Sequence, residues 1–454
     1  MRPGTVQVGF LSFVGQSLSC TVSERAKRTV KIKLALFSAF LIVAMLVALI
    51  PAPAMAQDEV VELTFGSWRT DDIGPWNEIL KVFHEEHPNI VVNFNPTVPT
   101  EYDAQLRTAL EGGVGPDIML LRSFDRTLRM WNDGLLMDLT DLPGLENYSD
   151  MALSAWSDGE HQYGVPAMSV LHGFLYNKDM FDEYGLEEPT TQQELLDVCQ
   201  VFKDDGIDCF AMGTKDGWAP GVMFWDNIAP NYYGGNETRL ALIRGEIDFT
   251  DPRFVKAFEA VAEYAPYLPA GHEAISYPDT QQMFIIGLAP IFPAGSWEIP
   301  VFEPQVDFEM GFFPPPLPND HKEGDPCYMC DHLDAGLGGN PATAHPEEVR
   351  TFLEWTTTAE FAQLFVDNLA GFFPLSNHPV TISDPLAAEV LSMRDTCEGT
   401  IRIGYQYFAA GDPPLNTLLW NDATVGVLQG KYTPEEAAAH VAEGLASWYV
   451  PPEQ

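Results

Sequence analysis

Strands and helices alternate at a regular pace near the start of the chain, and this pattern limits the fold more than any other feature. Residues 60–65 are β-branched and alternating, which indicates a strand, and residues 89–94 indicate a second. Apolar residues at helical spacing lie between them, at residues 76–84. Another helix, residues 101–110, stops at two glycines and leads into a short apolar strand at residues 117–121. This order predicts a doubly wound α/β lobe with a buried parallel strand.

Three capping boxes predict further helices, because a Thr and a Glu three residues later satisfy each other's free backbone N–H groups. The boxes are Thr191 with Glu194, Thr357 with Glu360, and Thr433 with Glu436. The first predicts a helix to about residue 202, and the second a helix over residues 361–368. The third, with Pro434 in the first helical position, predicts a helix that runs towards Trp448.

Length and charge exclude several classes of protein. The 454 residues exceed what one hydrophobic core usually holds, so two lobes are expected. A hydrophobic content of 46% excludes wholesale disorder. The formal net charge of −41 would repel nucleic acid and anionic membranes, and it disfavours phosphorylated ligands. We therefore expect no nucleic-acid partner.

The N-terminus carries the three parts of a secretory signal. Basic residues cluster at residues 25–33, an uncharged apolar run follows at residues 34–50, and Ala54 and Ala56 form a small-residue cleavage site. No Cys stands at the end of the apolar run, so the usual lipid-attachment site is missing. We expect cleavage near Ala56 and a soluble periplasmic or extracellular product. The alternative is that the apolar run stays as a membrane anchor.

Five cysteines follow this site, and export permits disulfides. A turn-like segment separates Cys199 from Cys209, which suits a bridge between a helix end and the following strand. The pairing of Cys327, Cys330 and Cys397 is open, and the odd count leaves at least one thiol free or intermolecular.

Residues 327–334 hold two thiols, two carboxylates and an imidazole, which raises the question of a metal site. A structural zinc site would bring a second Cys/His pair at a set spacing, and the sequence has none. The C-x-x-C element also lies away from a first strand-to-helix junction, where redox motifs occur. We interpret the segment as disulfide or loop structure and expect no metal and no cofactor.

A series of short motifs follows in fixed order over residues 60–450. They are residues 63–68 (LTFGSW), 83–92 (FHEEHPNIVV), 102–113 (YDAQLRTALEGG), 115–118 (GPDI), 163–166 (YGVP) with 175–181 (LYNKDMF), 294–298 (AGSWE), and 336–341 (GLGGNP) with the helix at 347–355. In this order the chain resembles the extracellular solute-binding proteins of ABC importers, in the sugar-binding group that includes the maltose-binding proteins.

The resemblance implies two doubly wound α/β lobes joined by a hinge of three crossings, with the ligand held in the cleft between them and closure on binding. It places residues 57–166 with about 292–345 in one lobe, and residues 167–291 with about 346–454 in the other, after a leader of residues 1–56. The three crossings are expected at residues 163–181, 294–298 and 336–341. A sugar and a membrane permease are the implied partners of a monomeric protein.

Sugar recognition needs aromatic faces and planar polar groups, and candidates for both occur at strand ends and loops. The candidates are Trp68, Tyr102, Gln105, Arg122, Ser123, Asp125, Trp218, Trp297, Glu298 and Asp334. Those that follow the first and third strands are chosen because the carboxyl ends of parallel strands face the ligand crevice. For Trp68 the alternative is packing beneath its own loop, and for Glu298 it is a solvated charge.

Capture without chemistry is the preferred function, and two alternatives stay open. The sequence has no G-x-S-x-G, H-E-x-x-H or G-x-G-x-x-G motif, so no enzyme activity is expected. A secreted carbohydrate-active hydrolase is the first alternative, because such an enzyme needs two carboxylates around one bond and carboxylates abound here. A binding protein for a polyamine or another cation is the second, suggested by the negative charge.

Overall fold

The computed structural model describes residues 60–452, so the predicted signal and its cleavage site lie outside the described residues. Helices surround one nine-stranded sheet whose main strand order is β2-β1-β3-β7-β4-β5. Among residues 60–452, no helix has the length and apolar character needed to cross a membrane.

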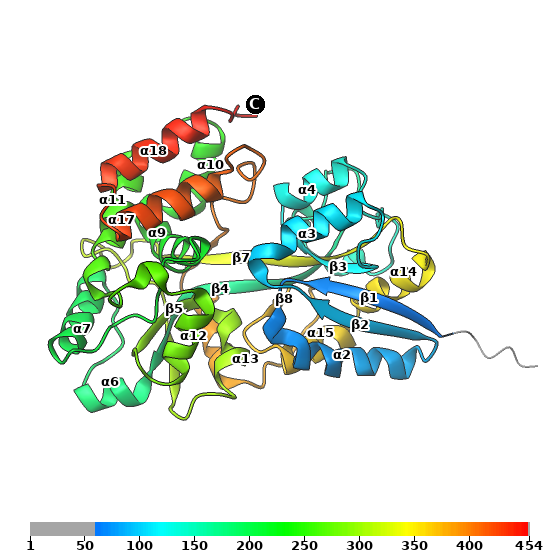
Figure 1. Cartoon of the computed structure of the whole chain (residues 1–454), viewed down its shortest axis with the longest axis horizontal. Coiled ribbons are helices and arrows are strands. Elements are labelled where there is room, and N and C mark those ends of the chain that lie inside the picture. The colour runs from blue at the N-terminus through cyan, green and yellow to red at the C-terminus, as the bar shows by residue number, and fades with distance from the viewer. Residues whose placement is uncertain (1–59, 453–454) are drawn as a thin grey trace, which may run out of the picture. The chain divides into compact units, whose positions relative to one another are not determined.

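The first lobe confirms the predicted alternation. Strands β1 (Val61–Ser67), β2 (Ile90–Pro96) and β3 (Ile118–Arg122) are parallel, with β1 in the middle. Helix α2 (Ile73–Glu86) connects β1 to β2, and α3 (Pro99–Glu111) connects β2 to β3. In Figure 1, α3 and α4 lie on one side of these strands, and α2 and α15 lie on the other. The carboxyl ends of β1 and β3 therefore reach the same edge of the sheet.

Two long antiparallel strands carry the sheet from the first lobe into the second (Figure 1). Strand β7 (Tyr328–Gly339) pairs with β3 at one end, and β4 (Val165–Asn177) pairs with β7. Further along, β4 pairs with β5 (Ile291–Gly295) and β6 (Met310–Phe313). Every residue of β4 is buried, as expected of a strand at the centre of the molecule.

The structure has three crossings, two of which differ from the expected positions. The chain passes out along β4, returns along β7, and passes out again at β8 (Phe373–Pro374), which pairs with β4. Residues 294–298, the expected return crossing, stay in the second lobe. They include the end of β5, which pairs with the distal half of β4, and the chain then continues into α13 (Ile299–Phe302).

The packing of two helices also differs from the expected division at about residues 292 and 346. Helix α14 (Pro346–Trp355) contacts β7, and Phe352 lies 6.0 Å from Phe65 of β1 between ring centroids. Helix α15 (Ala359–Asn368) packs on α2. Both helices therefore belong with the first lobe, since their apolar faces complete its core.

Most of the remaining helices cover the second lobe. Helices α9 (Asp226–Tyr233), α11 (Pro252–Ala262) and α18 (Pro434–Ala446) pack together with the π-helical segment η8 (Thr417–Thr424). The other elements used below are α4 (Asp125–Asn132), α6 (Lys178–Tyr184), α7 (Gln192–Asp204), α8 (Trp218–Pro220), η3 (Gly221–Trp225), α10 (Gly235–Ile243), α12 (Tyr277–Ile285), η6 (Ser296–Glu298), α16 (Pro385–Ser392), β9 (Glu398–Thr400) and α17 (Val425–Leu428).

Two of the three predicted capping boxes are confirmed, at the starts of α7 and α18. The third prediction is wrong. The cap of α15 is Thr358, whose side chain accepts from the backbone N–H of Phe361. Thr357 instead donates to the carbonyl of Glu354 in the preceding helix, so it is not free to cap α15 and Glu360 has no reciprocal partner.

The predicted Cys199–Cys209 disulfide is confirmed, and it ties α7 to the segment that meets β5 at Phe210. A second disulfide joins Cys327 to Cys397, so it links the start of β7 to β9. Cys330 is a free, buried thiol in β7. Most of residues 327–334 thus form a strand with a disulfide at its start. Within the part of the chain that the structure describes, no group of three or more His, Cys, Asp or Glu side chains gathers around a possible metal position.

Candidate functional site

A cavity of about 610 Å³ lies where the two lobes and the crossing strands meet. The first lobe contributes the end of β1, the start of α3 and the end of β3. The second lobe contributes α8, the start of α12, η6 and residues 402–420. The aromatic residues of the lining are Trp68, Trp218, Tyr277, Trp297, Phe372, Tyr405 and Trp420. The charged residues are Arg69, Asp71, Asp103, Arg122, Arg126, Asp216, Asp334 and Arg402.

An aromatic group on the second lobe forms one wall. The rings of Trp218 and Tyr277 are half-buried, with centroids 4.7 Å apart. The indole Nε1 of Trp297 donates to the hydroxyl of Tyr277 at 3.1 Å, and that hydroxyl donates to the carboxyl of Glu298. Gln281 donates to the other oxygen of Glu298 at 3.1 Å. These bonds hold the rings at fixed angles, which prepares an apolar face for a ligand.

Glu298 lies behind this wall and is fully buried. Burial raises the pKa of its carboxyl to about 8, the positive charge of Arg69 lowers it, and the charges of Asp71 and Asp72 raise it. Two side chains, those of Tyr277 and Gln281, bond this carboxyl, so Glu298 supports the aromatic wall from beneath and does not line the cavity.

On the first lobe, the guanidinium of Arg122 lies 3.6 Å from the ring centroid of Trp68, a cation–π contact. The ring of Tyr102 lies 5.8 Å from Trp68. Trp68 is buried and still lines the cavity, so packing and cavity lining both apply to this residue.

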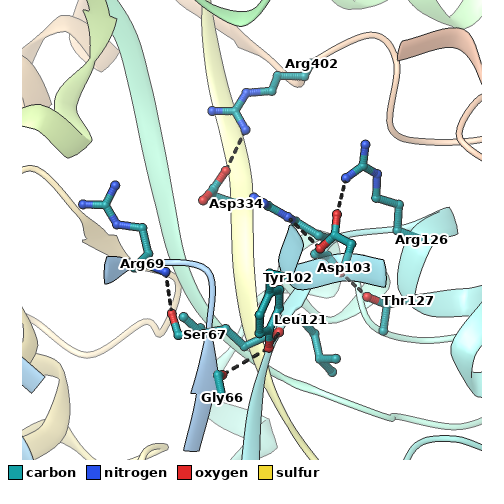
Figure 2. Close-up of polar contacts among 12 residues, drawn as sticks. Gly66, Ser67, Arg69, Tyr102, Asp103, Leu121, Arg126, Thr127, Asp334 and Arg402 are labelled. Atoms are coloured by element: carbon teal, nitrogen blue, oxygen red, sulfur yellow. Dashed lines mark hydrogen bonds and ion pairs between the residues drawn. The ribbon is translucent and has the colours of Figure 1, made fainter. Parts of the chain in front are cut away.

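Each arginine of the cavity has a carboxylate neighbour. Arg402 Nη1 lies 2.7 Å from Asp334 Oδ1, and Arg126 Nη1 lies 2.8 Å from Asp103 Oδ2 (Figure 2). Asp103 also faces Arg122 at 3.6 Å, and Arg69 pairs with the buried Asp72 at 2.8 Å. These pairs make the cavity nearly neutral, although the whole chain carries a formal charge of −41. They also hold both donors and acceptors in place at the cavity surface.

Two buried histidines, His172 and His332, lie next to Arg402 and outside the cavity lining. Arg402 Nε donates to His172 Nε2 at 3.1 Å, so this ring nitrogen carries no proton. The His332 ring lies 4.3 Å from the ring of Tyr405 between centroids. Burial, and then the charge of Arg402, hold the pKa of both imidazoles well below the ordinary value. Asp226, also buried nearby, has a pKa raised to about 8 by burial.

The structure brings half of the ten sequence candidates into the cavity: Trp68, Arg122, Trp218, Trp297 and Asp334. The other five lie outside its lining. Tyr102 is buried and donates to the carbonyl of Gly66 (Figure 2) and to that of Leu120. Gln105 is exposed and donates to Glu101, and Ser123 is buried beside His332. Asp125 accepts from the backbone of Ala409, and Glu298 lies behind the aromatic wall.

Several lining residues were not among the sequence candidates. Arg69 directly follows Trp68 at the carboxyl end of β1, so the reason for choosing Trp68 could have included Arg69 as well. Tyr277, Arg402, Tyr405 and Trp420 lie in segments without a motif, and they reach the cavity only through the packing of the second lobe.

Comparison with known proteins gives a consistent family. The sequence model of the family described as bacterial extracellular solute-binding protein matches residues 67–363. An ABC transporter extracellular-binding protein of Pyrococcus horikoshii is 25% identical over 245 residues, which is 53% of this chain and 57% of that protein. The alpha-glucosides-binding periplasmic protein AglE of Rhizobium meliloti is 24% identical over 323 residues, 65% of this chain and 68% of that protein.

Solved structures show the same fold. The solute receptor AcbH, described as preferring β-D-galactopyranose, matches with a TM-score of 0.74 and 18% identity over 86% of this chain and 99% of its own. The solute-binding protein RafE of Streptococcus pneumoniae, solved in complex with raffinose, matches with a TM-score of 0.70 and 21% identity over 86% of this chain and 99% of its own.

Proposed function

The chain belongs to the bacterial extracellular solute-binding proteins, and on this premise we propose that it captures a sugar in its inter-lobe cavity for an ABC importer. The observation that carries the proposal is one cavity lined by both aromatic rings and arginine–carboxylate pairs. In this proposal the protein acts outside the cytoplasmic membrane after removal of residues 1–56, and it hands the closed, loaded form to a permease.

The chemistry of a sugar matches both kinds of lining. The C–H face of a pyranose packs on an aromatic ring, and here Trp218 and Tyr277 present half-exposed faces. Ring hydroxyls both donate and accept, so they need fixed acceptors and donors side by side. The Arg402–Asp334 and Arg126–Asp103 pairs provide these on opposite lobes. A sugar bound between them would contact both lobes at once.

Closure follows from this arrangement. The lobes are joined along β4, β7 and β8, so a bend of these crossing segments changes the width of the cavity. Only a closed form completes contacts from both sides, and binding therefore shifts the population towards closure.

The named relatives support the sugar class. Among them are a protein described as binding alpha-glucosides and structures described with raffinose and with a preference for β-D-galactopyranose. These descriptions differ in sugar and in length, so the class is supported and the particular sugar is left to experiment.

Binding of a polyamine is less well supported. Four arginines line the cavity, and two of its four aspartates, Asp103 and Asp334, are already paired with an arginine. Hydrolysis is also less well supported. A glycosidase needs two carboxyl groups placed around one bond, whereas Asp103 and Asp334 are engaged by arginine and Asp216 accepts from the backbone of Tyr277.

Calorimetric titration of residues 57–454 tests the proposal, with galactose, maltose and raffinose as ligands and spermidine and Ca²⁺ as competing candidates. Saturable binding of one sugar in the micromolar range, about −8 kcal/mol, is the expected result. Response to spermidine alone would contradict the sugar class, and slow heat that never saturates, with release of reducing ends, would indicate hydrolysis.

A further inference from the structure

Residues 402–416, the strap, leave the second lobe and reach the first lobe at α4. The strap connects β9 to η8; residues 402–414 contain turns and bends, and residues 415–416 are helical and lead into η8. In Figure 1 this orange loop extends from the helices of the second lobe towards α4. It is a link between the lobes that is separate from the three crossing segments.

The strap is fixed to the second lobe by side-chain contacts. Gln406 accepts from Arg239 of α10 at 2.9 Å. The ring of Phe408 lies 4.7 Å from the ring of Tyr449, which follows α18. The strap must therefore move with the second lobe when the lobes open or close.

Helix α4 of the first lobe bonds the backbone of one residue of the strap, Ala409, on both sides. The backbone N–H of Ala409 donates to Asp125 Oδ2 at 3.3 Å. The carbonyl of Ala409 accepts from Arg129 Nη2 at 2.9 Å. Asp125 and Ala409 are both buried. Two charged side chains of one helix thus bond the same residue of the other lobe, and charge-assisted bonds of this kind are the stronger ones.

The same strap also lines the cavity. Arg402 pairs with Asp334, Tyr405 lies in the lining, and the guanidinium of Arg126 on α4 lies 5.4 Å from the Tyr405 ring. Within the eight residues 402–409, the strap therefore passes from the cavity surface to its contact with α4.

We propose that the strap is a closure latch: Asp125 and Arg129 hold Ala409 so that the lobes stay closed while Arg402 and Tyr405 contact the ligand. Asp125 and Arg129 are positioning residues, since neither lines the cavity. The contacts span the lobes and must break before the cavity opens, so the latch sets the rate at which ligand leaves. The ligand in this proposal rests on the proposed function. The bonds between α4 and Ala409 can be tested without any ligand.

The test combines a ligand-free distance measurement with dissociation kinetics. Spin labels at Val114→Cys in the first lobe and Ile286→Cys in the second report the inter-lobe distance, because both side chains are exposed. The latch variant is Asp125→Ala with Arg129→Ala. The matched control is Arg107→Ala, an arginine of α3 whose partners Glu111 and Asp133 belong to its own lobe.

Without ligand, the latch variant is expected to shift the distance distribution towards a more open form, while the control keeps that of the unsubstituted protein. Circular dichroism at each step shows that the variants are folded. A distribution identical in the latch variant and the unsubstituted protein would overturn the latch, whatever the ligand is.

The kinetic arm uses galactose, maltose and raffinose. For a sugar that binds, the latch variant should release it at least ~10-fold faster with little change in association rate. Asp125→Asn, which keeps an acceptor for the Ala409 N–H, should recover part of this effect. Equal dissociation rates would overturn the latch. If none of the three sugars binds, this result would count against the proposed sugar class. The ligand-free distance measurement alone would then test the latch.

Discussion

The indole nitrogen of Trp297 donates a hydrogen bond to the hydroxyl of Tyr277 at 3.1 Å. That hydroxyl in turn donates a hydrogen bond to the buried carboxyl of Glu298. A ring that lines the cavity is thus joined, through a second ring, to a side chain that never reaches the surface. The geometry of the ligand site depends on this buried chain of bonds.

Tyr277→Phe should keep the ring and remove the hydroxyl at the centre of this chain. We expect a loss of about 1–3 kcal/mol in the free energy of unfolding, because Glu298 and the Trp297 N–H each lose a partner. Urea unfolding followed by circular dichroism measures it. Tyr184→Phe is the control, since its hydroxyl bonds Asp205 at the surface. Equal losses of unfolding free energy in the two variants would show that these buried hydrogen bonds contribute no more than one at the surface.

Trp218→Ala should weaken sugar binding by roughly 10- to 100-fold, since burying an aromatic side chain against a ligand contributes about 1.5–3 kcal/mol. Calorimetry with the best sugar of the panel gives the affinity. Trp131→Ala serves as the comparison. Trp131 stacks on Tyr163, with centroids 5.4 Å apart, and lies outside the cavity lining. If the two tryptophan variants bind equally well, Trp218 is not a ligand platform.

Arg402→Met should cost about 3–5 kcal/mol of stability, because it leaves Asp334 as a buried carboxylate without its cation. Adding Asp334→Leu should restore most of the stability and leave sugar binding lost, since the donors and acceptors are then both gone. Arg350→Met, at a surface pair with Asp141, should change stability by less than ~1 kcal/mol. A double variant that binds sugar normally would show that this pair is only structural.

Stability should fall as the pH rises from about 6.5 to 8. The folded protein holds the proton of Glu298 more tightly than the unfolded chain, since its pKa is raised from 4.5 to about 8 by burial. Its contribution is therefore fully present below about pH 4.5 and is lost as the pH rises through about 8. The pKa of Asp226 is raised in the same direction. The lowered pKa values of His172 and His332 act below pH 6.5, where their contribution is lost as the pH falls.

Glu298→Gln should make this decline shallower by up to ~1.4 kcal/mol per pH unit, the limit for one proton. Urea unfolding at a series of pH values gives the slope for both proteins. Parallel slopes between pH 6.5 and 8 would mean that Glu298 is already ionised in the folded protein.

Features that depend on neighbours along the chain could be predicted from the sequence. The alternation of β1, α2, β2, α3 and β3 follows from apolar periodicity. The caps of α7 and α18 follow from residues three apart, and the Cys199–Cys209 bridge closes a short interval. Trp68 and Arg122 were found because the ends of parallel strands share one edge of a sheet.

Features that join distant positions became apparent only in the folded protein. Arg402 meets Asp334 across 68 residues, and Arg69 reaches the backbone of Trp297 across 228. Local sequence patterns predicted neither the pairing of Cys327 with Cys397 nor the position of the return crossing on β7.

Asp125 shows the reason most clearly. Arg122 is the last residue of β3 and Asp125 comes three residues later. The position at the end of this strand placed both in the predicted site, yet Arg122 lines the cavity and Asp125 bonds the strap. Local spacing determines where a backbone element ends. Which way a side chain then faces, and what stands opposite it, depends on how segments far apart in sequence pack around the crossing strands. That packing is a property of the folded chain as a whole and leaves no periodic trace in the sequence.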